Sequence, residues 1–317
     1  MPELFDLVTL GETMATVVRD GQSDRFRVAT AGSESNVAAG LAQLGCRTRW
    51  LSRLGDDELG HLVAESIAGH GVDVVVDWDP VRVTGLCVKE LSRAGTLMRY
   101  YRSRSAARHL GEMDLSDLTR ASWIHLTGIT PALSPQNCDL VTDLLSNRPG
   151  TARMSFDVNY RPVLWPDKAN AANVLVRLAR LADVVFIGED EAQALLGTTA
   201  VDEVAGALLC TEGQQLVFKR GAGAVTLVTS EGQVSEPAND VEVVDLVGAG
   251  DAFAAGYLAA SIWGWPATGR LRLGHYLAAR AIGVTEDIGP SIGTEDRARL
   301  ASSVQQRVPH TIGEARL

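Results

Sequence analysis

The chain has 317 residues, of which 46% are hydrophobic, 21% charged and 5% aromatic, and its formal net charge is −10. This length and composition predict a packed globular core and argue against a disordered chain. The negative charge disfavours binding to nucleic acid or to an anionic membrane, so an anionic substrate would need a local group of basic residues. The four cysteines form no Cys-x-x-Cys pair and the six histidines do not cluster, which argues against structural zinc.

Two segments bear on where the protein is expected in the cell. Residues 1–10 lack the basic region and the long apolar run of a secretory signal peptide. The most apolar stretch, residues 252–263, is too short to cross a bilayer. We therefore expect a cytoplasmic protein.

Short apolar runs alternate with helix-like segments along most of the chain, beginning with a strand at residues 4–10 that ends at Gly11. The further predicted strands cover residues 47–54, 72–76, 123–126, 153–158, 184–187 and 216–219. The predicted helices cover residues 33–44, 56–68, 135–145, 169–182 and 189–196. This alternation predicts an α/β fold in which helices sandwich a mostly parallel sheet.

Two segments, residues 13–29 and 83–104, interrupt the alternation because each resembles short strands without an intervening helix. The second predicts a hairpin that turns near residues 92–95. We expect a small sheet apart from the main body, acting as a lid over a cleft, and the alternative is a simple extension of the sheet edge. No repeat or linker divides the chain, so residues 1–317 are expected to form a single α/β domain.

The clearest functional motif covers residues 243–253, where a β-rich run is followed by Gly248-Ala249-Gly250, by Asp251 and by an apolar helix. Glycine lets the backbone turn with its N–H groups facing inward. The start of a helix adds partial positive charge. These properties predict an anion site suited to phosphate.

Asp251 needs an explanation because a carboxylate repels phosphate. One explanation is a general base that accepts the proton of a hydroxyl as this hydroxyl attacks a terminal phosphoryl group. The alternative is a helix cap, which aspartate often provides. The segment has neither Gly-x-Gly-x-x-Gly nor a Walker lysine, so it matches neither standard nucleotide motif.

Three further segments place polar residues beside small ones. In the first, Gly32 could let a ligand approach the backbone and Asn36 could bind sugar hydroxyls, although a plain helix start capped by Ser33 would give the same sequence. The other two, residues 157–162 and 218–224, follow predicted strands. Ligands of open α/β sheets bind at such strand ends.

Together these motifs resemble those of the ribokinase-like carbohydrate kinases of the PfkB family. Residues 248–251 match the C-terminal signature of that family, and residues 32–45 and 55–60 match two other family segments in the same order. The similarity covers nearly the whole chain. Three segments look most like the 2-keto-3-deoxygluconate kinases of the family: residues 99–104, 125–134 and 157–165.

The resemblance implies a ribokinase-like fold and an ATP-dependent phosphorylation of 2-keto-3-deoxygluconate to 2-keto-3-deoxy-6-phosphogluconate. Asp251 would be the catalytic base, and the anion hole would consist of Gly248, Ala249 and Gly250. The residues along ATP would be Asn159, Lys219, Gly221 and Gly223. Together with Asn36, the residues that hold the sugar acid would be Gly32, Tyr100, Arg102, Arg161 and Asp287.

The expected cofactors are ATP and Mg²⁺, which would be held mostly by phosphates and water. Glu191 is the candidate protein ligand of the metal, and a requirement for a monovalent cation such as K⁺ is left open. The expected partners are the sugar acid and ATP, without nucleic acid or membrane. We also expect a homo-oligomer that associates through the lid.

Three positions depart from the family pattern. Leu246 stands where the family carries a threonine, so a hydroxyl is missing near the phosphates. Gly188 replaces the asparagine of the Asn-x-x-Glu element, which weakens the assignment of Glu191 to a metal. Cys87 stands where a similar kinase carries a tyrosine that faces the substrate, which puts the exact sugar in doubt.

Although the protein is acidic overall, a stretch of ten residues contains four arginines: Arg99, Arg102, Arg104 and Arg108. On a strand, Tyr100, Arg102 and Arg104 would share one face. A tyrosine and two guanidinium groups facing the cleft would suit a carboxylate. The alternative is a solvated edge that keeps a lid strand from aggregating.

Three other functions compete with the leading hypothesis. Another kinase of the family, such as a fructokinase or a ribokinase, would share every motif above. A nucleotide-binding regulator without catalysis would account for the changes at Leu246 and Gly188, but the intact Asp251 argues against it. A Rossmann dehydrogenase would need a glycine motif that the sequence lacks.

Overall fold

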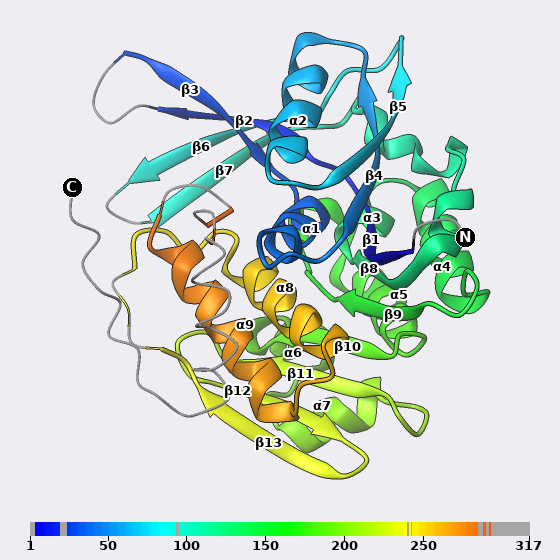
Figure 1. Cartoon of the computed structure of the whole chain (residues 1–317), viewed down its shortest axis with the longest axis vertical. Helices are drawn as coiled ribbons and strands as arrows, with labels where there is room; N and C mark the ends of the chain where they lie inside the picture. Colours follow the sequence, from blue (N-terminus) through cyan, green and yellow to red (C-terminus); the bar gives the residue numbers. More distant parts are fainter. Residues whose placement is uncertain are drawn as a thin grey trace.

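The structure, a computed structural model, describes residues 4–19, 24–92, 95–239, 241, 243–284, 288–289 and 292. In these residues a nine-stranded sheet lies between two layers of helices, and a four-stranded sheet projects from the body (Figure 1). The predicted α/β class is confirmed.

The large sheet has the order β13-β12-β11-β10-β9-β8-β1-β4-β5. Its pairs are parallel from β11 to β5, and β12 and β13 extend one edge in antiparallel pairing. Its strands are β1 (Phe5–Leu10), β4 (Thr48–Gly55), β5 (Asp73–Asp79), β8 (Ala121–Thr127), β9 (Arg153–Asp157), β10 (Val184–Gly188), β11 (Gln215–Lys219), β12 (Ala224–Thr229) and β13 (Gly232–Pro237).

Both faces of the large sheet are buried, which explains why its strands are apolar runs rather than alternating sequences. On β10, Val184 and Phe186 face one helical layer, whereas Val185 and Ile187 face the other. The first layer consists of α1 (Ser33–Gln43), α8 (Ala249–Ile262) and α9 (Ala267–Ile282). The second consists of α4 (Pro135–Ser146), α5 (Lys168–Ala179), α6 (Glu189–Leu196) and α7 (Val201–Leu208).

The remaining helices are short or flank the small sheet. They are α2 (Glu58–Gly69), α3 (Ile129–Leu133) and the 3-10 helices η1 (Ala106–Glu112), η2 (Ser116–Arg120) and η3 (Pro162–Leu164). Side chains of α1 and α2 pack together with Trp50 and Leu54 of β4. None of the helices among the described residues is long and apolar enough to cross a membrane.

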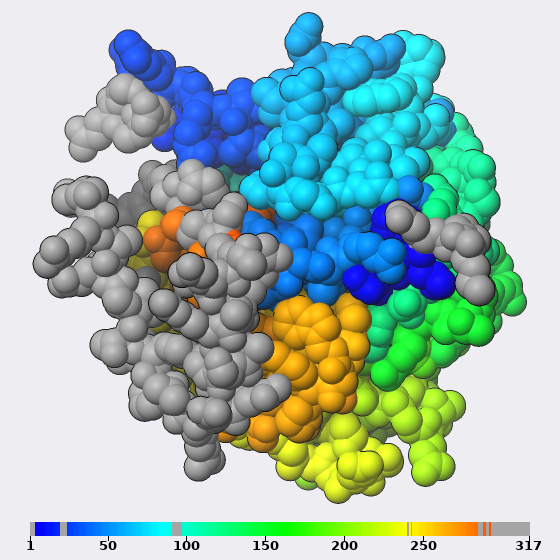
Figure 2. Space-filling view, in the orientation of Figure 1, coloured from blue at the N-terminus to red at the C-terminus, as the bar shows by residue number. Residues whose placement is uncertain are grey.

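The small sheet has the order β3-β2-β6-β7 and consists of β2 (Met14–Arg19), β3 (Phe26–Ala31), β6 (Leu86–Ser92) and β7 (Gly95–Tyr101). These strands lie almost wholly within the two segments predicted from the sequence, and β6 and β7 form the expected hairpin. Because the four strands form a sheet of their own, an extension of the large sheet is the wrong alternative. Figure 2 shows the β2–β3 end of the small sheet projecting beyond the body (blue, upper left).

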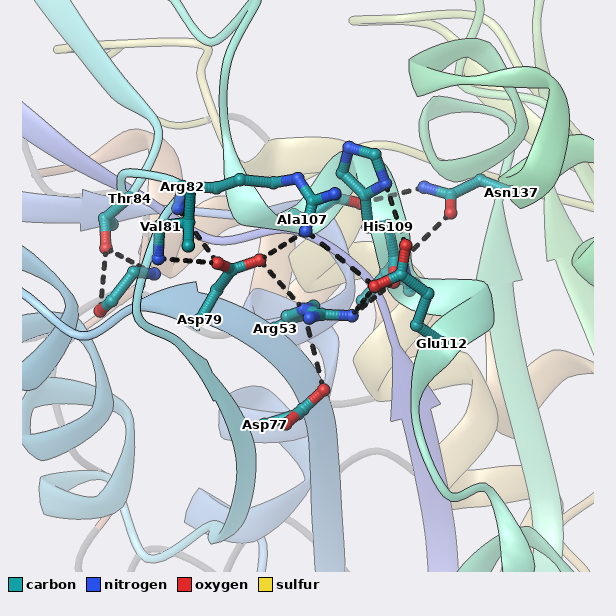
Figure 3. Close-up of polar contacts among 12 residues, drawn as sticks. Arg53, Asp77, Asp79, Val81, Arg82, Thr84, Ala107, His109, Glu112 and Asn137 are labelled. Carbon is teal, nitrogen blue, oxygen red and sulfur yellow. Dashed lines mark hydrogen bonds and ion pairs between the residues drawn. The ribbon is translucent and has the colours of Figure 1, made fainter.

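A network of charges holds two of the connections between the small sheet and the body, the one before β6 and the one after β7 (Figure 3). Arg53 on β4 lies 3.2 Å from Asp79 and 2.5 Å from Glu112. Arg82, in the connection from β5 to β6, lies 2.8 Å from the same Asp79. Burial alone would raise the pKa of Asp79, but hydrogen bonds from Arg82 hold it below its ordinary value. The network therefore fixes the base of the small sheet to the ends of β4 and β5.

Several elements were not foreseen. The elements α7, α9, β12 and β13 were not predicted from the sequence. The β-rich run at residues 243–247 contains no strand at its described positions, because the N–H groups of Val244 and Asp245 bind the carbonyl of Ile282.

Candidate functional site

A cleft of about 860 Å³ lies between the small sheet and the carboxyl ends of β9, β10 and β11. Most residues that the sequence assigned to function line this cleft. They are Gly32, Asn36, Tyr100, Arg102, Asn159, Arg161, Glu191, Lys219, Gly248, Gly250 and Asp251. Their common location agrees with the rule that open α/β sheets bind ligands at the ends of their strands.

Asp251 lies in the first turn of α8 and faces the first turn of α1. Ser33 Oγ donates to its Oδ1 at 2.6 Å, and Asn36 Nδ2 donates to its Oδ2 at 2.9 Å. Burial raises its pKa to about 6, although the bonds from Ser33 and Asn36 lower it. A carboxylate with this pKa is mostly ionised at neutral pH and is a stronger base than an exposed aspartate.

Two glycines allow this arrangement. Gly248, the N-cap of α8, has φ = +82°, a left-handed conformation that glycine adopts without strain. Gly32 is the N-cap of α1, at a position where a Cβ atom would come within 2.3 Å of Thr13 Oγ1. The N-terminal turns of α1 and α8 can therefore meet at the cleft, and N–H groups in the first turn of a helix have no intrahelical partner.

Ser33 connects Asp251 to Asn159. Asn159 Nδ2 donates to Ser33 Oγ at 2.8 Å, which leaves the serine hydrogen directed at Asp251. Asn159 has φ = +38°, a conformation that is rare outside glycine and often marks functional sites. Its Oδ1 is buried without a hydrogen-bond partner, so this oxygen can accept a bond from a ligand.

Lys219, at the end of β11, places an ammonium group in the cleft. Its Nζ lies 2.7 Å from Asp157 Oδ2, and Asp157 is 3% exposed at the end of β9. Burial alone would lower the pKa of Lys219, but Asp157 and Glu191 raise it above its ordinary value. Lys219 is therefore a fixed cation that can attract phosphate.

Glu191 has both oxygens engaged with the backbone. Its Oε1 accepts from the N–H of Tyr160 and its Oε2 from the N–H of Gly188, both at 2.7 Å. The carboxylate thus caps the start of α6 and joins it to the segment after β9. No three His, Cys, Asp or Glu side chains in the described part of the chain form a group that could hold a metal.

The basic residues of the small sheet differ from the expected arrangement. Tyr100 lies on β7, but β7 ends at Tyr101, so the strand does not align Tyr100, Arg102 and Arg104 on one face. Arg102 is buried in the cleft, whereas Arg104 is exposed. The charge of Arg102 can be buried because its guanidinium forms an ion pair with Glu12, which is 2% exposed.

The remaining candidates are not among the residues that line the cleft. Gly221 and Gly223 belong to the turn between β11 and β12, outside the residues that line the cleft. Ala249 is the first residue of α8, and Asp287 lies outside the described residues.

Two features of the site were not predicted from the sequence: the ion pair of Glu12 with Arg102 and the hydrogen bond from Ser33 to Asp251. The position of Glu12 just after β1 could have indicated a role in the cleft, because ligands of open α/β sheets bind at the ends of strands.

The comparisons with known proteins cover most of the chain. Residues 5–292 match the model of the pfkB family carbohydrate kinases. A 2-dehydro-3-deoxygluconokinase of Bacillus subtilis (strain 168) is 34% identical over 96% of this chain and 98% of that protein. A fructokinase of Escherichia coli is 32% identical over 78% of this chain and 82% of that protein. A crystal structure of a PfkB protein from Polaromonas sp. JS666 is 31% identical, has a TM-score of 0.83, and matches 94% of this chain and all of that one.

Proposed function

The chain belongs to the pfkB family of carbohydrate kinases, and we propose that it transfers the γ-phosphoryl group of ATP to the 6-hydroxyl of 2-keto-3-deoxygluconate. One observation carries the chemical part of this proposal. A partly buried carboxylate, Asp251, lies at the glycine-led start of a helix and faces a cleft large enough for two ligands. The identity of the sugar rests on the 34% identical relative named above.

Asp251 acts as the general base. As the sugar oxygen forms its bond to the γ-phosphorus, the bond from that phosphorus to the oxygen of the ADP leaving group breaks, and the hydroxyl proton moves to an oxygen of Asp251. Ser33 and Asn36 hold the carboxylate in place without protonating it. Because Asp251 keeps lone pairs beyond these two bonds, it can also accept the substrate hydroxyl.

The start of α8 stabilises the transferring phosphoryl group. We assign the anion hole to the backbone N–H groups of Gly248, Ala249 and Gly250, which together with the helix dipole favour negative charge at this position. The N–H of Ala249 makes a long bond of 3.4 Å to the carbonyl of Leu246, which a phosphate oxygen would have to replace. Lys219 supplies a full positive charge beside this helix start, because a Cβ atom on Gly250 would lie only 3.6 Å from its Nζ. We assign Asn159 to the nucleotide through its free Oδ1, and Gly221 and Gly223 to the outer part of the ATP site.

A divalent metal is implied by the kinase family, and Mg²⁺ is our proposal for it. Asp157 Oδ1 is a buried oxygen without a hydrogen-bond partner beside the cleft, which fits a hydrated ion bound mainly to phosphates. Glu191 fits less well because both its oxygens accept backbone bonds. The metal would neutralise phosphate charge, while the residues named above orient the reactants. A requirement for K⁺ stays a prediction.

We propose that Gly32, Asn36, Tyr100, Arg102 and Arg161 bind the sugar acid. Arg161 is exposed at the wall of the cleft, and the N–H of Arg102 at Nε is buried without a hydrogen-bond partner. Either guanidinium can donate to a carboxylate. Asp287 stays a prediction outside the described residues.

A fructokinase activity is the second candidate. Glu12 neutralises Arg102 in the sugar part of the cleft, which reduces the advantage of an anionic substrate. Turnover of 2-keto-3-deoxygluconate, 2-keto-3-deoxygalactonate, fructose and ribose, followed by ADP release, distinguishes these activities. We expect the highest kcat/KM for 2-keto-3-deoxygluconate and a product phosphorylated at C6 by mass spectrometry and phosphorus NMR. Strong turnover of neutral sugars with none of either sugar acid would reject the proposed substrate.

We also propose that two copies of the chain associate through the small sheet and that the protein is cytoplasmic. Phe26, Val28, Leu97 and Tyr101 on this sheet are 42–60% exposed, and such apolar side chains are often covered in an oligomer. Light scattering after size exclusion tests the association. A monomer at micromolar concentration would contradict it.

A further inference from the structure

A buried ion pair joins the small sheet to the segment just before α8. Lys89 lies on β6 opposite Met98 of β7, and residues opposite each other in a sheet share a face. Because Met98 lines the cleft, Lys89 projects from the same face of the small sheet. Its Nζ lies 2.6 Å from Asp245 Oδ2, and the two side chains are 2% and 4% exposed.

The other oxygen of Asp245 holds the turn that leads into the phosphate site. Asp245 Oδ1 accepts from the N–H of Val247 at 3.2 Å. Val247 precedes Gly248, whose left-handed conformation starts α8 and so fixes the direction of its first N–H groups. A single carboxylate therefore contacts the small sheet with one oxygen and the phosphate-binding turn with the other.

Because the ion pair between Lys89 and Asp245 is buried, it strongly constrains the position of the small sheet relative to the turn before α8. Removing one partner of a buried ion pair is strongly unfavourable because the other charge stays buried without compensation. If the small sheet moved away from the body, Asp245 would lose this counter-charge. Its negative charge would then lie close to the site proposed for the phosphates of ATP and would repel them.

The sugar part of the cleft is in contact with the same sheet. Met98 and Tyr100 of β7 line the cleft together with Asp245 and Gly248. A sugar that contacts β7 favours the position of the small sheet in which Lys89 reaches Asp245. A ligand shifts such an equilibrium by as much as its affinities for the two positions differ.

We propose that Lys89 is a positioning residue that couples the sugar site to the phosphate site through Asp245, so that the sugar and the nucleotide bind cooperatively. This inference rests on the proposed kinase function. Lys89 itself is not among the residues that line the cleft, so its effect on ATP passes through the turn rather than through a direct contact. Coupling of this kind is reciprocal, so ATP also strengthens binding of the sugar.

The test measures the affinity of a non-hydrolysable ATP analogue by calorimetry, with and without saturating 2-keto-3-deoxygluconate. In the wild-type protein we expect the sugar to strengthen analogue binding about fivefold or more. In Lys89→Met we expect weaker analogue binding and a change of less than twofold on adding the sugar. Lys89→Arg, which keeps the charge, should restore most of the coupling.

Two further variants test whether a general loss of charge or a failure to fold explains the result. Arg99→Gln breaks an exposed ion pair with Glu90 on the same sheet and should leave the coupling unchanged. If Lys89→Met does not fold, the double variant Lys89→Met with Asp245→Asn removes both buried charges and should fold without coupling. Thermal unfolding of each variant checks that the protein is intact.

Three results would overturn the inference. The first is wild-type coupling in a folded Lys89→Met or double variant. The second is an equal loss of analogue affinity with and without sugar, which would indicate simple electrostatic attraction. The third is a wild-type enzyme that turns over a sugar of the panel although this sugar does not change the affinity for the ATP analogue. A different preferred sugar would refute only the substrate assignment, because that sugar then replaces 2-keto-3-deoxygluconate in the test.

Discussion

Replacing Asp251 by asparagine removes the proposed base and also a buried charge. We therefore expect the variant to lose activity and to gain stability. Burial raises the pKa of Asp251 from 3.8 to about 6. A shift of about two units corresponds to about 3 kcal/mol against the ionised folded protein. The side chain is partly exposed to the cleft, and screening by water reduces this to about 1–2 kcal/mol.

The sign follows from the two pKa values. Between pH 4 and pH 6 the folded protein holds this proton more tightly than the unfolded chain, so stability falls as pH rises through this window. Asp251→Asn removes that dependence and should be more stable than the wild type at pH 7.5. The introduced amide can donate to Asn36 Oδ1, which is buried without a partner, if the Asn36 amide rotates by half a turn.

The experiment combines kinetics with thermal unfolding. We expect a loss of kcat of roughly 10²–10⁴-fold, the usual contribution of a general base. Binding of an ATP analogue should persist, and Tm should rise by roughly 2–4 °C at pH 7.5, with a smaller rise at pH 5. Asp190→Asn, at an exposed acid in the first turn of α6, is the matched control and should change neither property. Near-normal turnover of Asp251→Asn would refute the assignment of the base.

The remaining predictions concern the same cleft. Log kcat/KM should fall with a slope of one as pH drops below about 6, because Asp251 becomes protonated, and a profile flat to pH 5 would contradict this. Arg102→Ala should raise the KM for the sugar acid roughly 10–100-fold with little effect on the KM for ATP, whereas equal effects in initial-rate kinetics would count against a carboxylate contact. Gly32→Ala should lower kcat strongly and reduce Tm, since its Cβ would lie 2.3 Å from Thr13 Oγ1, and an active, stable variant would show that the turn adapts.

Local patterns in the sequence were sufficient to predict most of the body and most of the residues that share the cleft. The strand at residues 184–187 and the helix at 189–196 agree with β10 and α6 because apolar runs and helix signals are local properties. Residues 232–237 were missed because β13 alternates exposed and half-buried residues after a short turn. The pattern resembles a loop unless its partner strand is known.

The polar contacts of the site were less predictable because they depend on pairing across the chain. Sequence alone identified Asp251 and Arg102 as polar residues in suitable segments. It could not predict that Glu12 compensates the charge of Arg102, or that Ser33 donates to Asp251. Each of these contacts joins elements that meet only in the folded protein.

The bond between Ser33 and Asp251 has a consequence for the order in which the enzyme becomes active. These residues are separated by 218 positions, so their contact closes a loop of two thirds of the chain. Closing so long a loop carries a large entropic cost, and contacts of this range contribute to slow folding. A nascent or truncated chain that lacks α8 can therefore contain most of the sheet without a base. We expect phosphoryl transfer to begin only once the two halves of the fold have joined.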